Sequence, residues 1–161
     1  VSHEYLIEQL QYISSNNKIM HNLNFNHPVK ELIWTGQPTG KGTSCSISTP
    51  TILSTGTYHL ELNGHQRFAP RDYRYFTKTQ VWQYHTGFGG LELTTTGLKN
   101  TIAVYSFALK PEEHQPSGTC NFSRIDNAIL ISENSTSLNI YAVNYNVLRI
   151  MSGMGGLAYS N

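Results

Sequence analysis

The chain has 161 residues, a formal net charge of +1 and only 13% charged residues. This length suffices for one domain with a substantial core, and the charge content lies well below the roughly 25% of an ordinary soluble domain. A net charge so close to zero supplies no strong field to attract nucleic acid or an anionic membrane face. The polar residues are mostly neutral hydrogen-bonding ones, which cost less to desolvate than charges and suit a surface that packs against neighbours.

Two cysteines, Cys45 and Cys120, lie far apart in the sequence. Their density is far below that of disulfide scaffolds, so we expect two reduced thiols and a cytosolic folding compartment. No apolar run approaches the length of a membrane-spanning helix, and no signal-peptide pattern opens the chain. Because the sequence starts at Val1 and enters an apolar segment at once, we expect it to be a piece of a longer protein.

Short apolar segments separated by Gly, Pro, Asn and Ser run through the chain, which predicts an all-β fold of antiparallel strands. The first expected strand, residues 5–13, is ambiguous because Leu6, Leu10 and Ile13 also fit a helical stripe. Residues 71–85 hold irregularly spaced aromatic residues that are compatible with a short helix. The other expected strands cover residues 29–34, 47–53, 57–63, 102–109, 128–132 and 139–151.

Three of these segments carry more detailed expectations. Residues 57–63 alternate between apolar and polar side chains, which predicts a half-buried strand. Residues 102–109 are apolar on both faces and should form a central strand. Residues 139–151 predict either one long strand whose halves bury different faces or two strands joined by a bend. Between the expected strands at 102–109 and 128–132, residues 115–118 carry Pro at the second and Gly at the fourth position, which fits a type I turn.

The sequence gives little support to catalytic or metal chemistry. The seven histidines show no spacing typical of a ligand pair, although His59 and His65 could converge in space. Residues 36–43 resemble a phosphate-binding loop only superficially, since the glycine spacing is one residue short and a strand is expected to follow. Glu112 and Glu113 are adjacent and point apart, and no serine lies in a nucleophile-elbow motif. We therefore expect neither an enzyme nor a bound cofactor or metal.

Two features leave binding alternatives open. Sequons at Asn121 and Asn134 are candidate glycosylation sites, of which Asn134 lies in the more polar surroundings. A set of aromatic residues could form a sugar-stacking platform, a plug in the core or a subunit contact. The set comprises Phe68, Tyr73, Tyr75, Phe76, Trp82 and Tyr84.

Five segments resemble, in order and across nearly the whole chain, signatures of the major capsid proteins of nucleocytoplasmic large DNA viruses. Residues 106–124 carry the most specific signature, a proline-bounded loop between two strands. Residues 60–86 contain an Asn-Gly turn, an Arg-Phe pair and a Tyr-Phe pair. Residues 25–34 contain a His-Pro-Val strand, residues 5–9 match the strand before it, and residues 141–161 match the family's C-terminal end.

The resemblance implies a single domain over residues 1–161, an eight-stranded antiparallel jelly roll that forms the second, C-terminal half of a double jelly-roll protein. It implies a structural protein of an icosahedral virion, in which three copies form a pseudo-hexagonal capsomer. The implied partners are further copies, neighbouring capsomers and minor capsid proteins, without nucleic-acid contact. An inner membrane could lie beneath the shell without insertion of this chain. Assembly in the host cytoplasm is implied as well.

The resemblance also assigns structural roles to residues of the family motifs. Arg67 and Arg124 each follow a turn, where they either bind carbonyl or carboxylate groups at a strand end or are solvated. Carbohydrate binding by the aromatic set, in a host-attachment module, is the alternative function. The motif residues are Asn63, Gly64, Arg67, Phe68, Pro111, Gln115, Pro116, Gly118 and Arg124.

Overall fold

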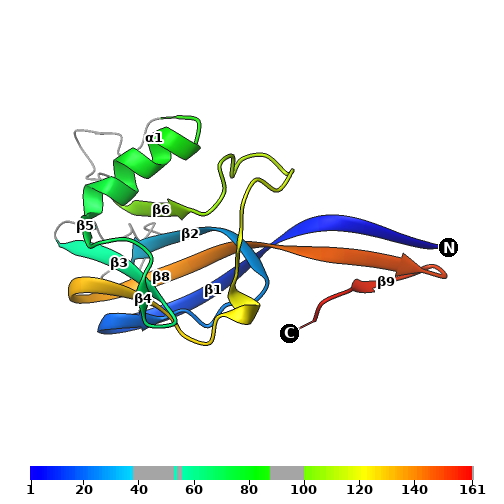
Figure 1. Cartoon of the computed structure of the whole chain (residues 1–161), viewed down its shortest axis with the longest axis horizontal. Coiled ribbons are helices and arrows are strands. Elements are labelled where there is room, and N and C mark those ends of the chain that lie inside the picture. The colour runs from blue at the N-terminus through cyan, green and yellow to red at the C-terminus, as the bar shows by residue number, and fades with distance from the viewer. Residues whose placement is uncertain (38–52, 54–55, 88–99, 161) are drawn as a thin grey trace, which may run out of the picture.

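The computed structural model describes residues 1–37, 53, 56–87 and 100–160 (Figure 1). Within these residues nine strands pair into one antiparallel sheet, which confirms the expected all-β class. The long strands are β1 (Ser2–Asn22), β2 (Pro28–Gly36), β3 (Thr57–Leu62), β6 (Ile102–Ser106) and β8 (Ala128–Met151). The short strands are β4 (His65–Gln66), β5 (Arg71–Asp72), β7 (Cys120–Asn121) and β9 (Met154–Leu157).

Two long strands, β1 and β8, curl this sheet into two layers. They pair along almost their whole lengths, and their register shifts between Ser15 and Met20. On its other edge, β8 pairs with β2 through residues 138–144 and with β3 through residues 128–132. A bulged, bent ribbon therefore contributes one segment of each strand to each layer. The expected strands at 128–132 and 139–151 are thus one continuous strand.

The core lies between the two layers. On β8, Leu138, Ile140 and Ala142 are fully buried, and they alternate with residues that face outward. Trp34 of β2 packs on Tyr58 of β3 with ring centroids 5.7 Å apart, so the two layers meet directly. Burial raises the pKa of Tyr58 to about 12, as expected for a phenol removed from water.

A short helical segment closes one end of the core. It consists of the π-helix η1 (Tyr75–Thr79) and α1 (Gln80–Tyr84), which confirms the expected short helix in residues 71–85. Phe76 of η1 is fully buried, with its ring centroid 5.1 Å from that of Trp34. Of the helices in the described residues, none is long and apolar enough to cross a membrane.

The other strand expectations met different outcomes. Residues 5–13 belong to β1 and are not helical. The alternation in residues 57–63 is confirmed, since Tyr58 and Leu60 are buried in β3. Of residues 47–53, only the buried Leu53 lies within the described residues. The strand expected at 102–109 ends at Ser106, and among the described strands β6 is the last in the path and not a central one.

Candidate contact surfaces

The outer face of the layer formed by β1, β8, β2 and β6 carries an apolar surface that is partly exposed. The strand register places Leu10 opposite Val143 and Tyr12 opposite Tyr141, on the face opposite the core. Leu10 is 63% exposed and Tyr12 is 53% exposed, although both are apolar or aromatic. We call this surface, which contains no charged residue, the outer patch. Its members are Leu10, Tyr12, Ile33, Ile102, Tyr141 and Val143.

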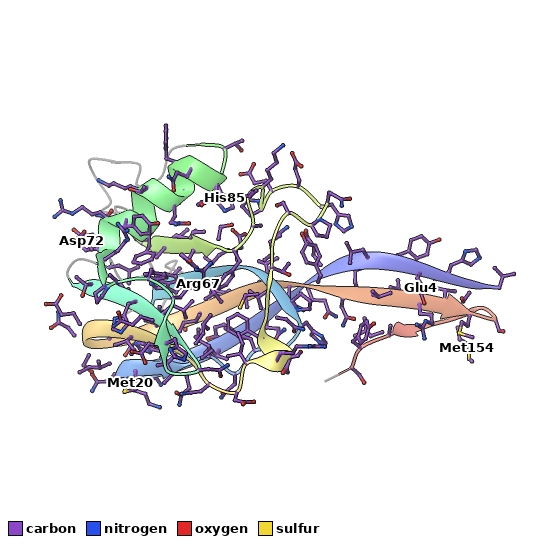
Figure 2. The ribbon with its side chains drawn as sticks, in the orientation of Figure 1. Glu4, Met20, Arg67, Asp72, His85 and Met154 are labelled. Atoms are coloured by element: carbon purple, nitrogen blue, oxygen red, sulfur yellow. The ribbon has the colours of Figure 1, made fainter. Side chains whose placement is uncertain are left out.

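A second exposed surface lies on the part of β1 and β8 that projects beyond the sandwich, with β9 beside it (Figure 1). We call residues 2–8, 145–151 and β9 the arm; Figure 2 shows Glu4 and Met154 on it. Asn146, which is 3% exposed, anchors the C-terminal tail because its amide donates to the carbonyl of Tyr159 at 2.8 Å. The exposed apolar residues of the arm are Tyr5, Leu6, Met151, Met154 and Leu157, and Tyr159 of the adjoining tail is exposed as well.

A β-bulge in β2 places two buried charged residues side by side on the outer face. The register with β8 slips between Val29 and Glu31, so Lys30 no longer follows the alternation that would point it into the core. The Lys30 ammonium, almost fully buried, forms an ion pair with Glu8 of β1. The Glu31 carboxylate contacts His85 Nε2 at 2.7 Å. Burial raises the pKa of Glu31, and His85 opposes this shift.

The Asn-Gly motif forms the tight connection between β3 and β4. Asn63 and Gly64 have φ values of 51° and 80°, and Leu62 pairs with His65 across them, which is the geometry of a type I′ hairpin. The Asn63 side-chain oxygen accepts hydrogen bonds from the backbone N–H groups of Asp126 and Asn127, at 3.0 and 3.1 Å. The turn is therefore attached to the loop that leads into β8.

The Arg-Phe pair that follows has two different environments. Phe68 is partly buried, and its ring centroid lies 4.7 Å from that of Tyr105. Arg67 is exposed, as is Arg124 at the end of the 3₁₀-helix η2 (Phe122–Arg124). Neither guanidinium makes a hydrogen bond or ion pair within the described residues, so their expected roles as ligands of carbonyl or carboxylate groups remain predictions. Arg124 lines a groove of about 440 Å³ together with Tyr145 and Tyr159.

The proline-bounded loop, residues 107–119, closes on itself over the outer face. Its turn lies at residues 110–113, where the Glu113 N–H donates to the Lys110 carbonyl at 3.2 Å. At residues 115–118, where a type I turn was expected, the backbone forms no hydrogen-bonded turn. Gly118 has a φ of 144°, and a Cβ there would lie 2.6 Å from the Phe107 carbonyl oxygen. A glycine is needed at this position because the backbone of residue 118 passes close to the backbone of residue 107. Pro111 is buried, whereas Gln115 and Pro116 are exposed.

The remaining candidates lie apart from one another. Asn121 is exposed, and its side chain accepts from the Ser123 N–H at 3.1 Å. Asn134 is exposed in the bend of β8. Glycosylation of either stays a prediction. Cys120 is a free, partly buried thiol whose pKa is raised by burial, while Cys45 lies outside the described residues. Among the residues described, no group of three or more His, Cys, Asp or Glu side chains could hold a metal ion.

Most of the aromatic set packs inward and offers no platform. Phe76 is in the core, and Phe68, Tyr73 and Tyr75 pack against it as partly buried residues. Trp82 differs, since it is 77% exposed on α1. One exposed ring gives the carbohydrate-binding alternative little support.

Comparison with known proteins decides the family. Residues 1–156 match the family model described as large eukaryotic DNA virus major capsid protein. The chain belongs to this family. It is 50% identical over 184 aligned residues to the major capsid protein of Pyramimonas orientalis virus, covering 100% of this chain and 44% of the relative. It is 41% identical over 223 aligned residues to the major capsid protein of Paramecium bursaria Chlorella virus 1, covering 99% of this chain and 49% of the relative.

Solved structures agree with this assignment. The chain matches PBCV-1 VP54 with a TM-score of 0.78 and 37% identity, over 100% of this chain and 52% of that one. This match confirms the jelly-roll fold. The Faustovirus major capsid protein shares the fold at 15% identity, with a TM-score of 0.59 over 93% of this chain and 34% of that one. The capsid protein chain spans about half the length of the curated relatives it matches.

Sequence reasoning missed the polar cluster around Lys30, Glu31 and His85. His85 is far from Lys30 and Glu31 in the sequence, and simple strand alternation would place Lys30 and Glu31 on opposite faces of β2. Only the bulge in β2 and the position of α1 bring the three residues together.

Proposed function

We propose that this chain is a shell-forming domain of a major capsid protein, which self-associates in the virion through the outer patch and the arm. The exposed apolar residues of the outer patch, in a chain of this family, are the observation that carries the proposal. Monomeric soluble proteins rarely expose a large contiguous apolar area unless it has a partner. An uncharged patch also loses no charge hydration on contact, so many modest interfaces can add up in a shell.

The finer arrangement follows the family resemblance. We propose that residues 1–161 form one jelly roll, the C-terminal half of a double jelly-roll protein, and that three copies form a pseudo-hexagonal capsomer. Neighbouring capsomers and minor capsid proteins are then the further partners, and assembly takes place in the host cytoplasm. The half-length coverage of the relatives and the match to half of VP54 support this division.

Paired variants test whether the outer patch is used. Leu10→Asp places a charge in the outer patch, while Ile19→Asp places one on the same strand beyond the bend, at a residue that is 49% exposed. With both variants made in the complete capsid protein, we expect Leu10→Asp to reduce the yield of three-fold particles with pseudo-six-fold outlines in electron microscopy, and Ile19→Asp to leave it unchanged. Light scattering after size-exclusion chromatography gives the mass of each variant in solution and so distinguishes trimers from monomers. Equal yields for both variants, or a wild-type protein that never leaves the monomeric state, would contradict the proposal.

A further inference from the structure

His85 joins two carboxylates that come from different parts of the chain. It is the C-terminal cap of α1, and Figure 2 places it between the end of that helix and the loop that follows β6. Its Nε2 lies 2.7 Å from Glu31 Oε2, and its Nδ1 lies 3.2 Å from Glu112 Oε1. Glu31 belongs to the sheet and Glu112 to the 107–119 loop. The imidazole therefore connects the loop to the outer face of the sheet.

The two contacts of His85 require one proton more than a neutral imidazole and two ionised carboxylates carry together. A neutral imidazole donates from one ring nitrogen and presents a lone pair at the other. With both nitrogens against carboxylate oxygens, the neutral ring would direct that lone pair at a negative charge. Both contacts are favourable only if the ring is an imidazolium or if one carboxyl is protonated. Glu31 is the candidate carboxyl, since its side chain is only 7% exposed and burial raises its pKa.

The surrounding charges favour retention of that proton. From β1, Glu8 faces the buried Lys30 of β2, and from β8 the ring of Tyr145 lies beneath the Lys30 ammonium at 5.5 Å. Glu8 pairs with the Lys30 ammonium, and the charges of Lys30 and Glu8 both act on Glu31, while Glu112 contacts His85. From the loop, His114 lies 3.8 Å from Glu8, while Glu113 forms a solvent-exposed pair with Lys110. An extra positive charge on His85 brings this cluster closer to neutrality.

Glu112 is attached at a second point. Its carboxylate accepts hydrogen bonds from the Thr86 N–H at 2.7 Å and from the Thr86 hydroxyl at 2.9 Å. These bonds lower the pKa of Glu112, so its charge persists into mildly acidic solution. The segment that follows α1 and the loop are therefore held to the sheet by the same few groups.

We propose that His85, Glu31 and Glu112 hold one shared proton that fastens the 107–119 loop to the outer face of the sheet. The loop is attached while the proton is present, and Glu112, the most exposed of the three, detaches when the proton is lost as pH rises. In acid, protonation of Glu112 removes its negative charge and weakens the same contact. Attachment of the loop is thus greatest at intermediate pH. This device acts within one chain and does not depend on the proposed self-association.

Nuclear magnetic resonance of the full chain tests the proton directly. The ¹⁵N signals of the His85 ring and the ¹³C signal of the Glu31 carboxyl report where the proton resides, while the exchange protection factor of the Thr86 amide reports attachment of Glu112. We expect the protection factor to fall at least about tenfold through the pH range in which the cluster loses its proton. A neutral ring beside two ionised carboxylates, with the Thr86 amide still protected, would overturn the proposal.

Adjacent glutamates supply a matched pair of variants. Glu112→Gln removes the charge that faces His85, and Glu113→Gln removes the charge of the next residue, which pairs with Lys110. Both side chains are solvent-exposed, so both variants should fold. We expect Glu112→Gln to lower the midpoint of proton loss by about one pH unit, and Glu113→Gln to shift it by less than about 0.3. Equal shifts in the two variants would also overturn the proposal.

Discussion

The two faces of the layer that contains β1, β8 and β2 carry similar apolar residues, but one face is buried and the other is exposed. On the core face, Leu138 and Ile140 are fully buried, whereas on the outer face Leu10 and Tyr12 are more than half exposed. Apolar character therefore does not decide which face is covered within the chain. The bend of β1 and β8 decides it, because it turns one face toward the second layer. An apolar face left outside that curl is available for contacts with other molecules.

The largest expected effect comes from the core face. Trp34 is fully buried and packs on Tyr58 and Phe76, so Trp34→Ala should lower the free energy of unfolding by about 3–5 kcal/mol. Urea denaturation at neutral pH measures this loss. Tyr12→Ala, on the outer face, is the control and should cost less than about 1 kcal/mol. Similar losses in the two variants would mean that the outer patch is as important for folding as the core.

The next effect lies at the bend that separates the two faces. His21 is fully buried there, with Nδ1 2.8 Å from Ser15 Oγ and Nε2 3.2 Å from Thr136 Oγ1. Burial, assisted by Lys18, lowers the pKa of His21 to about 4. The unfolded chain, with a histidine pKa near 6.5, therefore binds the proton more readily than the folded one. Stability is complete above about pH 6.5 and should fall by about 3 kcal/mol as pH drops to about 4.

Denaturation at pH 7 and pH 4 measures this dependence. His21→Gln should remove most of the difference between the two pH values, because an amide does not titrate in this range. His3→Gln, at an exposed residue of the same strand, should leave the difference unchanged. An acid sensitivity that is the same in His21→Gln as in the wild type would exclude the bend as its source.

The sequence predicted the regular parts of this fold better than its irregular ones. Alternation in β3 and the Asn63-Gly64 dipeptide specify local geometry, so both could be read directly. The position of Lys30 on the outer face could not be predicted in this way, because simple alternation places it beside Leu32 in the core and only the bulge turns it outward. The cluster at His85 depends on contacts between segments distant in the sequence. No local pattern encodes such contacts.

The smallest of these effects concerns the loop that covers part of the outer face. Gly118→Ala combines an unfavourable positive φ with a Cβ placed 2.6 Å from the Phe107 carbonyl oxygen, so the backbone must shift. We expect a loss of about 2 kcal/mol in the free energy of unfolding. Gly64→Ala shares the positive φ but meets no atom within 4 Å, and it should cost about 1 kcal/mol. The difference between the two losses, measured by urea denaturation, isolates the close approach between the two ends of the loop, at Gly118 and Phe107. If the losses are equal, positive φ alone accounts for both glycines, and the loop does not require this approach to remain over the sheet.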